Sequence, residues 1–297
     1  MAEPSLPSVL APPLPVQSMR ELELSGPEDF IDIPEDFYEE GVGLDPYFED
    51  CYEELGELYE EKKDSVFYKR QLQVKFENKY FHWVTSNALT KLKNEGVIKE
   101  VPIKKEDGTS RQFFVHPVNR YYKRIIKAHD KIIDQYSRPE VTRSCGHRAE
   151  DLFSLALMER GFRRIARKVK EFNGNRWDKS GHDLDFIFER NGNCWGCEIK
   201  NTLGYIEKSE MEIKLEMCSL LGLRPLFIMR ASAKTYNYEI IQSGGYVLIF
   251  GSQIYDVSQR ELVERMRNEL GLPVDCPTAI PSGIIDRFEN WFNKMGL

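Results

Sequence analysis

The sequence lacks the long apolar runs that membrane proteins need. It contains no run of about 18 apolar residues, so we expect no transmembrane helix and no membrane partner. The opening residues, MAEPSLPSVLAPPLPV, lack a basic n-region and an uninterrupted apolar stretch, so they do not predict a signal peptide. The chain has only six cysteines, without the spacing of a disulfide framework. These absences favour a cytoplasmic protein with reduced thiols.

Charge is distributed unevenly along the 297 residues. Residues 1–62 hold 18 acidic and two basic residues, a formal charge of −16, whereas residues 63–297 hold 30 acidic and 39 basic residues, a formal charge of +9. Hydrophobic residues make up 41% of the chain, enough for a real core, which excludes a fully disordered chain. The basic body predicts affinity for a polyanion, and the acidic leader could compete for the same surface.

The N-terminal leader has the composition of a disordered segment. Residues 1–46 hold eight of the 15 prolines together with an excess of acidic residues, so we expect them to be disordered. Residues 47–64 place aromatic and apolar residues at helical spacing, which predicts a short acidic helix at the start of the next domain.

Residues 47–118 are expected to form a small domain. Helices are predicted over residues 67–80 and 81–96, followed by strands over 97–104 and 111–117 with an Asp-Gly turn between them. This order resembles the winged helix-turn-helix family, in which the second helix enters the major groove of DNA. The resemblance implies DNA contacts for His82, Thr85, Ser86, Asn87, Lys91 and Lys93. The alternative is a winged helix that serves protein contacts or packing alone.

A connector helix is predicted between the two domains. Residues 119–139 place Tyr122, Ile125, Ile126, His129, Ile132 and Ile133 on one face, with basic residues around it. We expect Pro139 to end this helix. Its basic side could extend a nucleic-acid track, although a solvated face is the commoner explanation of such a charge pattern.

The residues that carry chemistry lie between positions 146 and 200. A helix over residues 146–162 contains Glu150, and two strands follow over 181–190 and 194–201, joined by an Asn-Gly turn. Because side chains alternate along a strand, Glu198 and Lys200 share one face and Ile199 points to the other. Carboxylates beside apolar runs are costly to bury without a partner. Two carboxylates on neighbouring strands would suit Mg²⁺ or Mn²⁺.

The order of these residues resembles the PD-(D/E)xK nuclease superfamily, over about residues 140–255. Gly146-x-x-x-Glu150, then D-L-D-F-I-F and C-E-I-K-N, is most similar to its Holliday-junction-resolvase and Mrr-like restriction branches. The resemblance implies that Asp185 and Glu198 bind the metal, that Lys200 positions or activates the attacking water, and that Glu150 is an auxiliary ligand. No proline precedes the aspartate, which leaves Asp183 as a competing ligand.

The remaining sequence predicts an α/β domain over residues 140–297. Helices over 208–223 and 258–272 alternate with apolar strands over 224–230 and 244–250, which indicates a three-layer, restriction-endonuclease-like fold. Arg163 and Arg164 belong to a basic run after the first helix and are candidates to contact DNA phosphates, unless they lie on a solvated loop or strand.

Three functions remain open at this point. The first is a Mg²⁺-dependent endodeoxyribonuclease, with the winged helix positioning duplex or branched DNA for repair, recombination or restriction. The second is a catalytically inactive DNA-binding regulator or scaffold of the same fold. The third is a protein-interaction module in which the acidic leader is the working part. Members of the superfamily that cut both strands are often dimers, so a homodimer is included among the expected assemblies. The sequence leaves the substrate open, including DNA against RNA.

Overall fold

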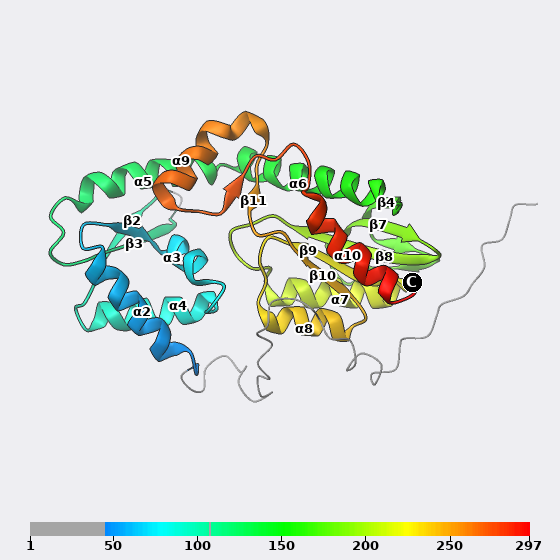
Figure 1. Cartoon of the computed structure of the whole chain (residues 1–297), viewed down its shortest axis with the longest axis horizontal. Coiled ribbons are helices and arrows are strands. Elements are labelled where there is room, and N and C mark those ends of the chain that lie inside the picture. Colours follow the sequence, from blue (N-terminus) through cyan, green and yellow to red (C-terminus); the bar gives the residue numbers. More distant parts are fainter. Residues whose placement is uncertain (1–44, 107) are drawn as a thin grey trace, which may run out of the picture.

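The structure, a computed structural model, describes residues 45–106 and 108–297 (Figure 1). The predicted disorder of the leader, apart from residues 45 and 46, falls outside the described residues, and so does Asp107 of the predicted hairpin turn. Within the described ranges, no helix combines the length and apolar character needed to cross a membrane.

The first region, residues 45–118, is called the N-terminal unit here. It contains α2 (Phe48–Glu61), β1 (Val66–Tyr68), α3 (Lys69–Phe76), α4 (His82–Asn94), β2 (Lys99–Lys104) and β3 (Ser110–Val115). The strands form an antiparallel sheet in the order β1-β3-β2. The two expected helices and the two expected strands are present in the expected order. The helix predicted over residues 67–80 is shorter, because its first residues pair with β3 as β1 and bury Val66 and Phe67.

Two long helices connect this unit to the rest of the chain: α5 (Tyr122–Tyr136) and α6 (Pro139–Glu159). Pro139 was expected only to end the connector helix, but it also occupies the first turn of α6. A proline is tolerated there because that position has no helical acceptor for its missing N–H. Arg138, just before it, is extended, as the proline ring requires. The helix that carries Glu150 therefore begins seven residues earlier than residue 146.

The second region, residues 139–297, is called the sheet unit. Its main sheet has the order β10-β9-β8-β7-β4. The strands are β4 (Arg163–Val169), β7 (Leu184–Arg190), β8 (Asn193–Lys200), β9 (Arg224–Met229) and β10 (Tyr246–Ile249). Strands β4, β7 and β8 pair antiparallel, whereas β8, β9 and β10 run parallel. Between β4 and β7, the short strands β5 (Glu171–Phe172) and β6 (Asn175–Arg176) form a separate hairpin.

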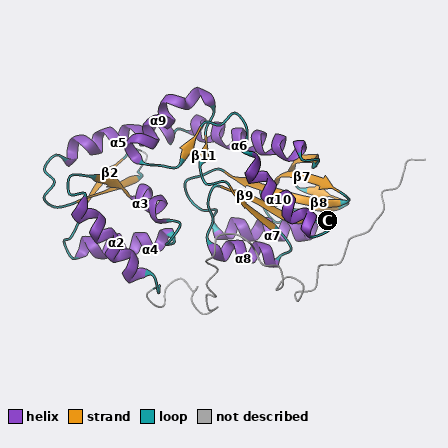
Figure 2. Cartoon of the chain, viewed as in Figure 1, coloured by secondary structure: helices purple, strands orange, loops and turns teal. Residues whose placement is uncertain are grey.

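Helices cover the main sheet from two sides (Figure 2). Helix α6 and α10 (Ser282–Lys294) share a core cluster with Phe186 and Phe188 of β7. Helix α7 (Lys208–Leu221) packs with Ile187, which points the opposite way, and α8 (Lys234–Gln242) packs with Phe227 and Met229 of β9. The chain is therefore a mixed α/β protein.

The C-terminal part of the sheet unit returns to the N-terminal unit. Helix α9 (Arg260–Leu270) lies beside α5 (Figure 1), next to the 3₁₀ turn Val257–Gln259 and the strand pair β11 (Gln253–Ile254) and β12 (Val274–Asp275). Val263 and Met266 of α9 share one buried cluster with Ile133 of α5 and with Val115 of β3. This shared apolar core holds the two units together.

Candidate functional site

Strands β7 and β8 bring Asp185 and Glu198 together. The turn between the strands contains Asn191 and Gly192, both with positive φ (54° and 78°), which is the backbone of a tight hairpin. The register pairs Phe186 with Cys197, and one further step sets Asp185 opposite Glu198. The Ile199 N–H also donates a hydrogen bond to Asp185 Oδ2 at 2.7 Å. The side chain of Ile199 itself enters the core, so the expected alternation along β8 is confirmed.

These carboxylates open into a cavity of about 500 Å³. Its lining residues are polar almost throughout, and they come from the loop before β7, from β7, from β8 and from α7. They are Gly181, His182, Asp183, Asp185, Glu198, Lys200, Glu210 and Lys214. Three of the four residues predicted as catalytic therefore meet in one place, and Asp183, the predicted competitor of Asp185, lies there too.

Glu198 is the buried centre of the cluster, with 3% of its surface exposed. Two lysines engage its two oxygens: Lys214 Nζ lies 2.5 Å from Oε2, and Lys200 Nζ lies 3.3 Å from Oε1. Burial raises the pKa of Glu198, and the two ammonium groups only partly offset this effect. Glu198 is thus held in place by cations from two directions.

Among the described residues, Asp185 forms no ion pair with a lysine or arginine, although the charge of Lys214 also acts to lower its pKa. Burial, reinforced by the nearby charge of Glu198, raises the pKa of Asp185 to about 7, although the Ile199 N–H acts in the opposite direction. An ionised Asp185 beside Glu198 is therefore costly until another positive charge arrives. Strongly perturbed carboxyl groups in a cavity are typical of functional sites.

Lys200 is held as a cation. Burial alone would lower its pKa, but the carboxylates of Glu198 and Glu210 outweigh burial and raise the pKa above its ordinary value. The Lys200 ammonium donates to Glu210 Oε1 at 2.6 Å. A lysine with a raised pKa is a poor base at neutral pH and a good hydrogen-bond donor.

From the sequence, Glu210 and Lys214 could be assigned to the helix that follows the E-x-K strand, from which they could reach a phosphate, but they could not be placed relative to Glu198. They lie four residues apart on α7, so they occupy one helix face, and that face meets the end of β8. Lys214 also donates to the backbone oxygen of Asp183. The signal in the sequence was a Glu and a Lys at i and i+4 on the helix after the E-x-K strand. Their relation to Glu198 depends on how α7 packs, which spacing alone does not give.

Glu150 differs from the predicted arrangement. It does not line the cavity; its carboxylate accepts a hydrogen bond from Arg167 of β4 at 3.1 Å. Its negative charge still contributes to raising the pKa of Asp185, so it lies near the site without entering it. The auxiliary-ligand role implied by the resemblance is not seen in this arrangement, because Arg167 satisfies the carboxylate.

The donor set allows a test of whether a divalent cation fits. Among the residues that the structure describes, no three His, Cys, Asp or Glu side chains form a group arranged to hold a metal ion. Mg²⁺, however, is commonly held by one or two carboxylates and completed by waters and phosphate oxygens. Asp185 and Glu198 meet that smaller requirement, and the raised pKa of Asp185 marks a place where positive charge is lacking. The residues present therefore fit Mg²⁺ or Mn²⁺ bound jointly with a phosphate.

The six residues of α4 predicted to face DNA are placed very differently from one another. Thr85 is fully buried, and His82 is 92% buried at the contact with the sheet unit. The Ser86 hydroxyl donates to the backbone oxygen of His82. Thr85 and His82 therefore cannot contact DNA in this arrangement, because the N-terminal half of α4 packs against protein.

The exposed side of α4 is partly neutralised. Lys91 pairs with Glu49 of α2 at 3.2 Å, and Lys93 pairs with Glu100 of β2 at 3.1 Å. Of the predicted set, Asn87 is exposed, and Ser86 and the two paired lysines are half-buried.

The two arginines of β4 lie on the edge strand of the sheet. Arg163 is exposed and pairs with Glu189 at 3.0 Å. Arg164 donates to the Ser154 hydroxyl, and its guanidinium lies 5.7 Å from the centre of the Phe186 ring. Both therefore belong to a strand rather than a loop, and their predicted phosphate contacts stay predictions.

Comparison with known proteins adds little to this geometry. The sequence matches no protein family model and no curated protein. Among solved structures, the chain is similar to a repair endonuclease from Pyrococcus abyssi, with 13% sequence identity and a TM-score of 0.23; the similarity covers 51% of this chain and 61% of that one. At that TM-score the similarity supports no argument about fold or function, so the site must be judged on its own residues.

Proposed function

We propose that this chain is a Mg²⁺-dependent endodeoxyribonuclease of the PD-(D/E)xK type, with a three-layer restriction-endonuclease-like sheet unit. The observation that carries the proposal is the convergence of Asp185, Glu198 and Lys200 on one cavity from two adjacent strands, with Lys214 added from α7. In this proposal the N-terminal unit is a winged helix-turn-helix that positions the DNA. Fewer residues of α4 can contact DNA than the sequence predicted, because His82 and Thr85 are buried.

The chemistry assigned to each residue follows from its charge. Asp185 and Glu198 would hold the ion, which when bound supplies positive charge at the scissile phosphate and lowers the pKa of a coordinated water. Lys200, kept protonated by Glu198 and Glu210, donates hydrogen bonds to a phosphate oxygen or to the attacking water. Lys214 holds the Glu198 carboxylate in place through Oε2, leaving Oε1 next to Lys200.

One observation favours an alternative function. Both oxygens of Glu198 lie within ion-pair distance of lysines, so an arriving cation must compete with two ammonium groups. A protein of this fold that binds DNA without cutting it would be consistent with such a neutralised carboxylate. The competition between lysine and metal is therefore the point that an experiment must decide.

The deciding experiment is cleavage of single-stranded, duplex, flap and four-way-junction DNA with Mg²⁺ or Mn²⁺. Asp185→Asn and Lys200→Met remove the proposed functions, while Glu261→Gln and Lys294→Met make the same charge changes at exposed positions of α9 and α10. We expect cleavage that EDTA, Asp185→Asn and Lys200→Met each abolish and that both control variants retain. Loss of one preorganised hydrogen-bond donor typically costs about 10²–10³-fold in rate. DNA binding without cleavage by the wild-type chain would instead establish the inactive alternative.

A further inference from the structure

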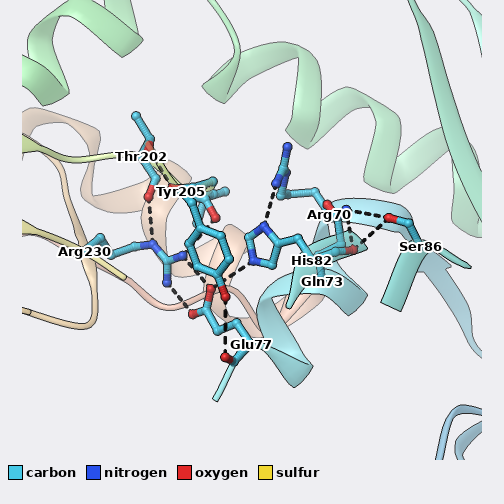
Figure 3. A network of polar contacts seen from close by, with 10 residues as sticks. Arg70, Gln73, Glu77, His82, Ser86, Thr202, Tyr205 and Arg230 are labelled. Atoms are coloured by element: carbon cyan, nitrogen blue, oxygen red, sulfur yellow. Dashed lines mark hydrogen bonds and ion pairs between the residues drawn. The ribbon is translucent and has the colours of Figure 1, made fainter. Parts of the chain in front are cut away.

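A second buried charge cluster lies where the N-terminal unit meets the chain segment that follows β8 (Figure 3). It is called the joint here. From the N-terminal unit it takes Arg70, Glu77 and His82; from the sheet unit it takes Tyr205 and Arg230. None of these residues was assigned to the catalytic cavity. The joint reaches the cavity at Lys200, because the backbone N–H of Arg230 donates to the backbone oxygen of Lys200.

Arg230 is the central residue of the joint. Its side chain has no exposed surface, and its guanidinium forms a bidentate pair with Glu77, with distances of 2.5 and 2.6 Å. Burial by itself would raise the pKa of Glu77, but hydrogen bonds from Arg230 and His82 outweigh it and hold the pKa below its ordinary value. Among the described residues, Glu77 is the only carboxylate that pairs with Arg230.

Arg230 also fixes the course of the chain after the E-x-K strand. Its guanidinium donates to the backbone oxygens of Thr202 at 2.7 Å and Leu203 at 2.9 Å. Its backbone N–H donates to the oxygen of Lys200 at 3.0 Å. One residue thus binds three carbonyls within residues 200–203, starting at the lysine of the cavity.

The same segment contacts the N-terminal unit directly. The Tyr205 ring stacks on His82, with ring centres 4.0 Å apart and planes within 11°. His82 in turn contacts Arg70 through Nδ1 at 3.1 Å and Glu77 through Nε2 at 3.3 Å. The Arg70 guanidinium lies so close to Gly204 that a Cβ there would approach it to 3.3 Å. Residues 202–205 therefore lie between Arg230 and α3–α4.

We propose that Glu77 is a positioning residue for the Lys200 end of β8, so that a carboxylate of the N-terminal unit, acting through Arg230, supports one edge of the cavity of the sheet unit. Removing one partner of a buried ion pair leaves an uncompensated charge, which is far more disruptive than losing an exposed pair. Without Glu77, the Arg230 guanidinium is expected to turn toward water and release Thr202 and Leu203. The shared apolar core of α5, α9 and β3 keeps the units associated, so the expected effect is local loosening.

The consequence would be coupling between DNA placement and catalysis. The positioning of Lys200 is a property of the joint, whereas its role in catalysis rests on the function proposed above. A duplex bound by the N-terminal unit would be held in a fixed orientation relative to Lys200, because both are tied to the same Arg230–Glu77 pair. A displacement of about 1 Å at a reacting group is enough to cost about 10²-fold in rate.

The test compares Glu77→Gln with Glu53→Gln, which neutralises an exposed carboxylate of α2 in the same unit. Hydrogen exchange of residues 199–206 is measured on the full chain without DNA. Then kcat and KM are measured on the substrate that the cleavage panel selects. We expect Glu77→Gln, and not Glu53→Gln, to speed exchange in this segment and to lower kcat by up to about 10²-fold with little change in KM. Glu77→Asp should lie between Glu77→Gln and wild type.

Each outcome separates this proposal from the proposed function. If Glu77→Gln speeds exchange but the wild-type chain cuts no DNA, the structural role of Glu77 is supported and the proposed nuclease function is wrong. Unchanged exchange together with an unchanged kcat overturns the positioning role while the nuclease stands. A rise in KM with an unchanged kcat also overturns it, since Glu77 would then serve DNA binding. If Glu77→Gln does not fold, Glu77→Asp is measured by the same two readouts against the same control.

Discussion

Two buried carboxylates of this protein, Asp185 in the cavity and Glu77 in the joint, have pKa values shifted in opposite directions although burial alone would raise both. Burial raises the pKa of Asp185 to about 7, whereas the pKa of Glu77 lies below its ordinary value. The difference is the partner: Arg230 binds both oxygens of Glu77, whereas the charge that most affects the pKa of Asp185 is the carboxylate of Glu198. In the proposed function, the carboxylate without an ion-pair partner is the one that receives a cation.

The joint and the cluster around Glu198 also differ in how open they are to solvent. The joint is closed, and its groups bond to one another and to backbone carbonyls. The cluster around Glu198 opens into a cavity of about 500 Å³ with acidic residues on several sides. In the proposed function, the open cavity admits a hydrated ion and a phosphate, whereas the proposed role of the closed joint is to position Lys200.

The largest effect is expected from removing one cation from each cluster. Lys214→Met and Arg230→Met each leave a buried carboxylate without its closest partner, which should cost about 3–5 kcal/mol of unfolding free energy. Mg²⁺ should recover part of the loss in Lys214→Met, because a divalent cation can replace the ammonium beside Glu198. It should recover nothing in Arg230→Met. Urea unfolding with Mg²⁺ and with EDTA measures both.

The control for this pair is Lys294→Met, which removes an exposed lysine and should change stability by less than about 0.5 kcal/mol. If Mg²⁺ restored the unfolding free energy of Lys214→Met and Arg230→Met equally, the contrast between the cavity and the joint would be wrong. The ion would then stabilise the folded state in general. No recovery of Lys214→Met would remove the argument that the Glu198 cluster accepts a cation.

Much of the cavity could be predicted from short sequence patterns. Asp185, Glu198 and Lys200 were found because a hairpin has a fixed register and a strand alternates its side chains, so an Asn-Gly turn and an E-x-K motif define their relation. The positions of Glu210 and Lys214 relative to these strands depend on tertiary packing of α7. The auxiliary-ligand role of Glu150 came from the resemblance, which does not reveal the hydrogen bond that Arg167 of β4 donates to it; that role stays a prediction.

The joint could not be predicted from the sequence. Glu77 and Arg230 are 153 residues apart, and neither belongs to a recognisable motif. The basic and polar residues of α4 suggested a DNA-facing helix, yet His82 and Thr85 are buried, because a polar side chain can serve a domain contact as well as a nucleic acid. The order of the predicted helices and strands of the N-terminal unit could be derived from the sequence. Which face of α4 packs against the rest of the protein could not.

Opposite pH dependence is the next expected effect. Because the pKa of Asp185 is raised from 3.8 to about 7, its contribution to stability falls as pH rises through that range, by an amount on the order of a few kcal/mol. The pKa of Glu77 is lowered from 4.5, so its contribution is present above that pH and is lost as pH falls through the folded-state value. In EDTA, Asp185→Asn should therefore gain stability relative to wild type as pH rises from 4 to 7.

Glu77→Gln should behave in the opposite way. It should be less stable than wild type at neutral pH and should approach wild type in acid, where Glu77 of the wild-type chain becomes protonated as well. Urea unfolding of the three proteins from neutral pH down into acid below the folded-state pKa of Glu77 measures both trends. If the two variants shifted in the same direction with pH, the contrast between an unsatisfied and a satisfied carboxylate would be wrong.

The smallest effect is expected at Glu150, which is paired with an arginine as Glu77 is, but lies near the cavity. It is near enough to raise the pKa of Asp185, but it pairs with Arg167 at the surface rather than entering the cavity. Exposed ion pairs contribute about 0–1 kcal/mol, so Glu150→Gln should lower the cleavage rate by less than about tenfold and leave Mg²⁺ affinity nearly unchanged. Cleavage rates over a Mg²⁺ titration, with Glu261→Gln as the exposed control, test this. A loss as large as that of Asp185→Asn, together with a clearly weakened Mg²⁺ affinity, would contradict this prediction and would indicate that Glu150 leaves Arg167 and becomes a ligand when DNA and metal bind.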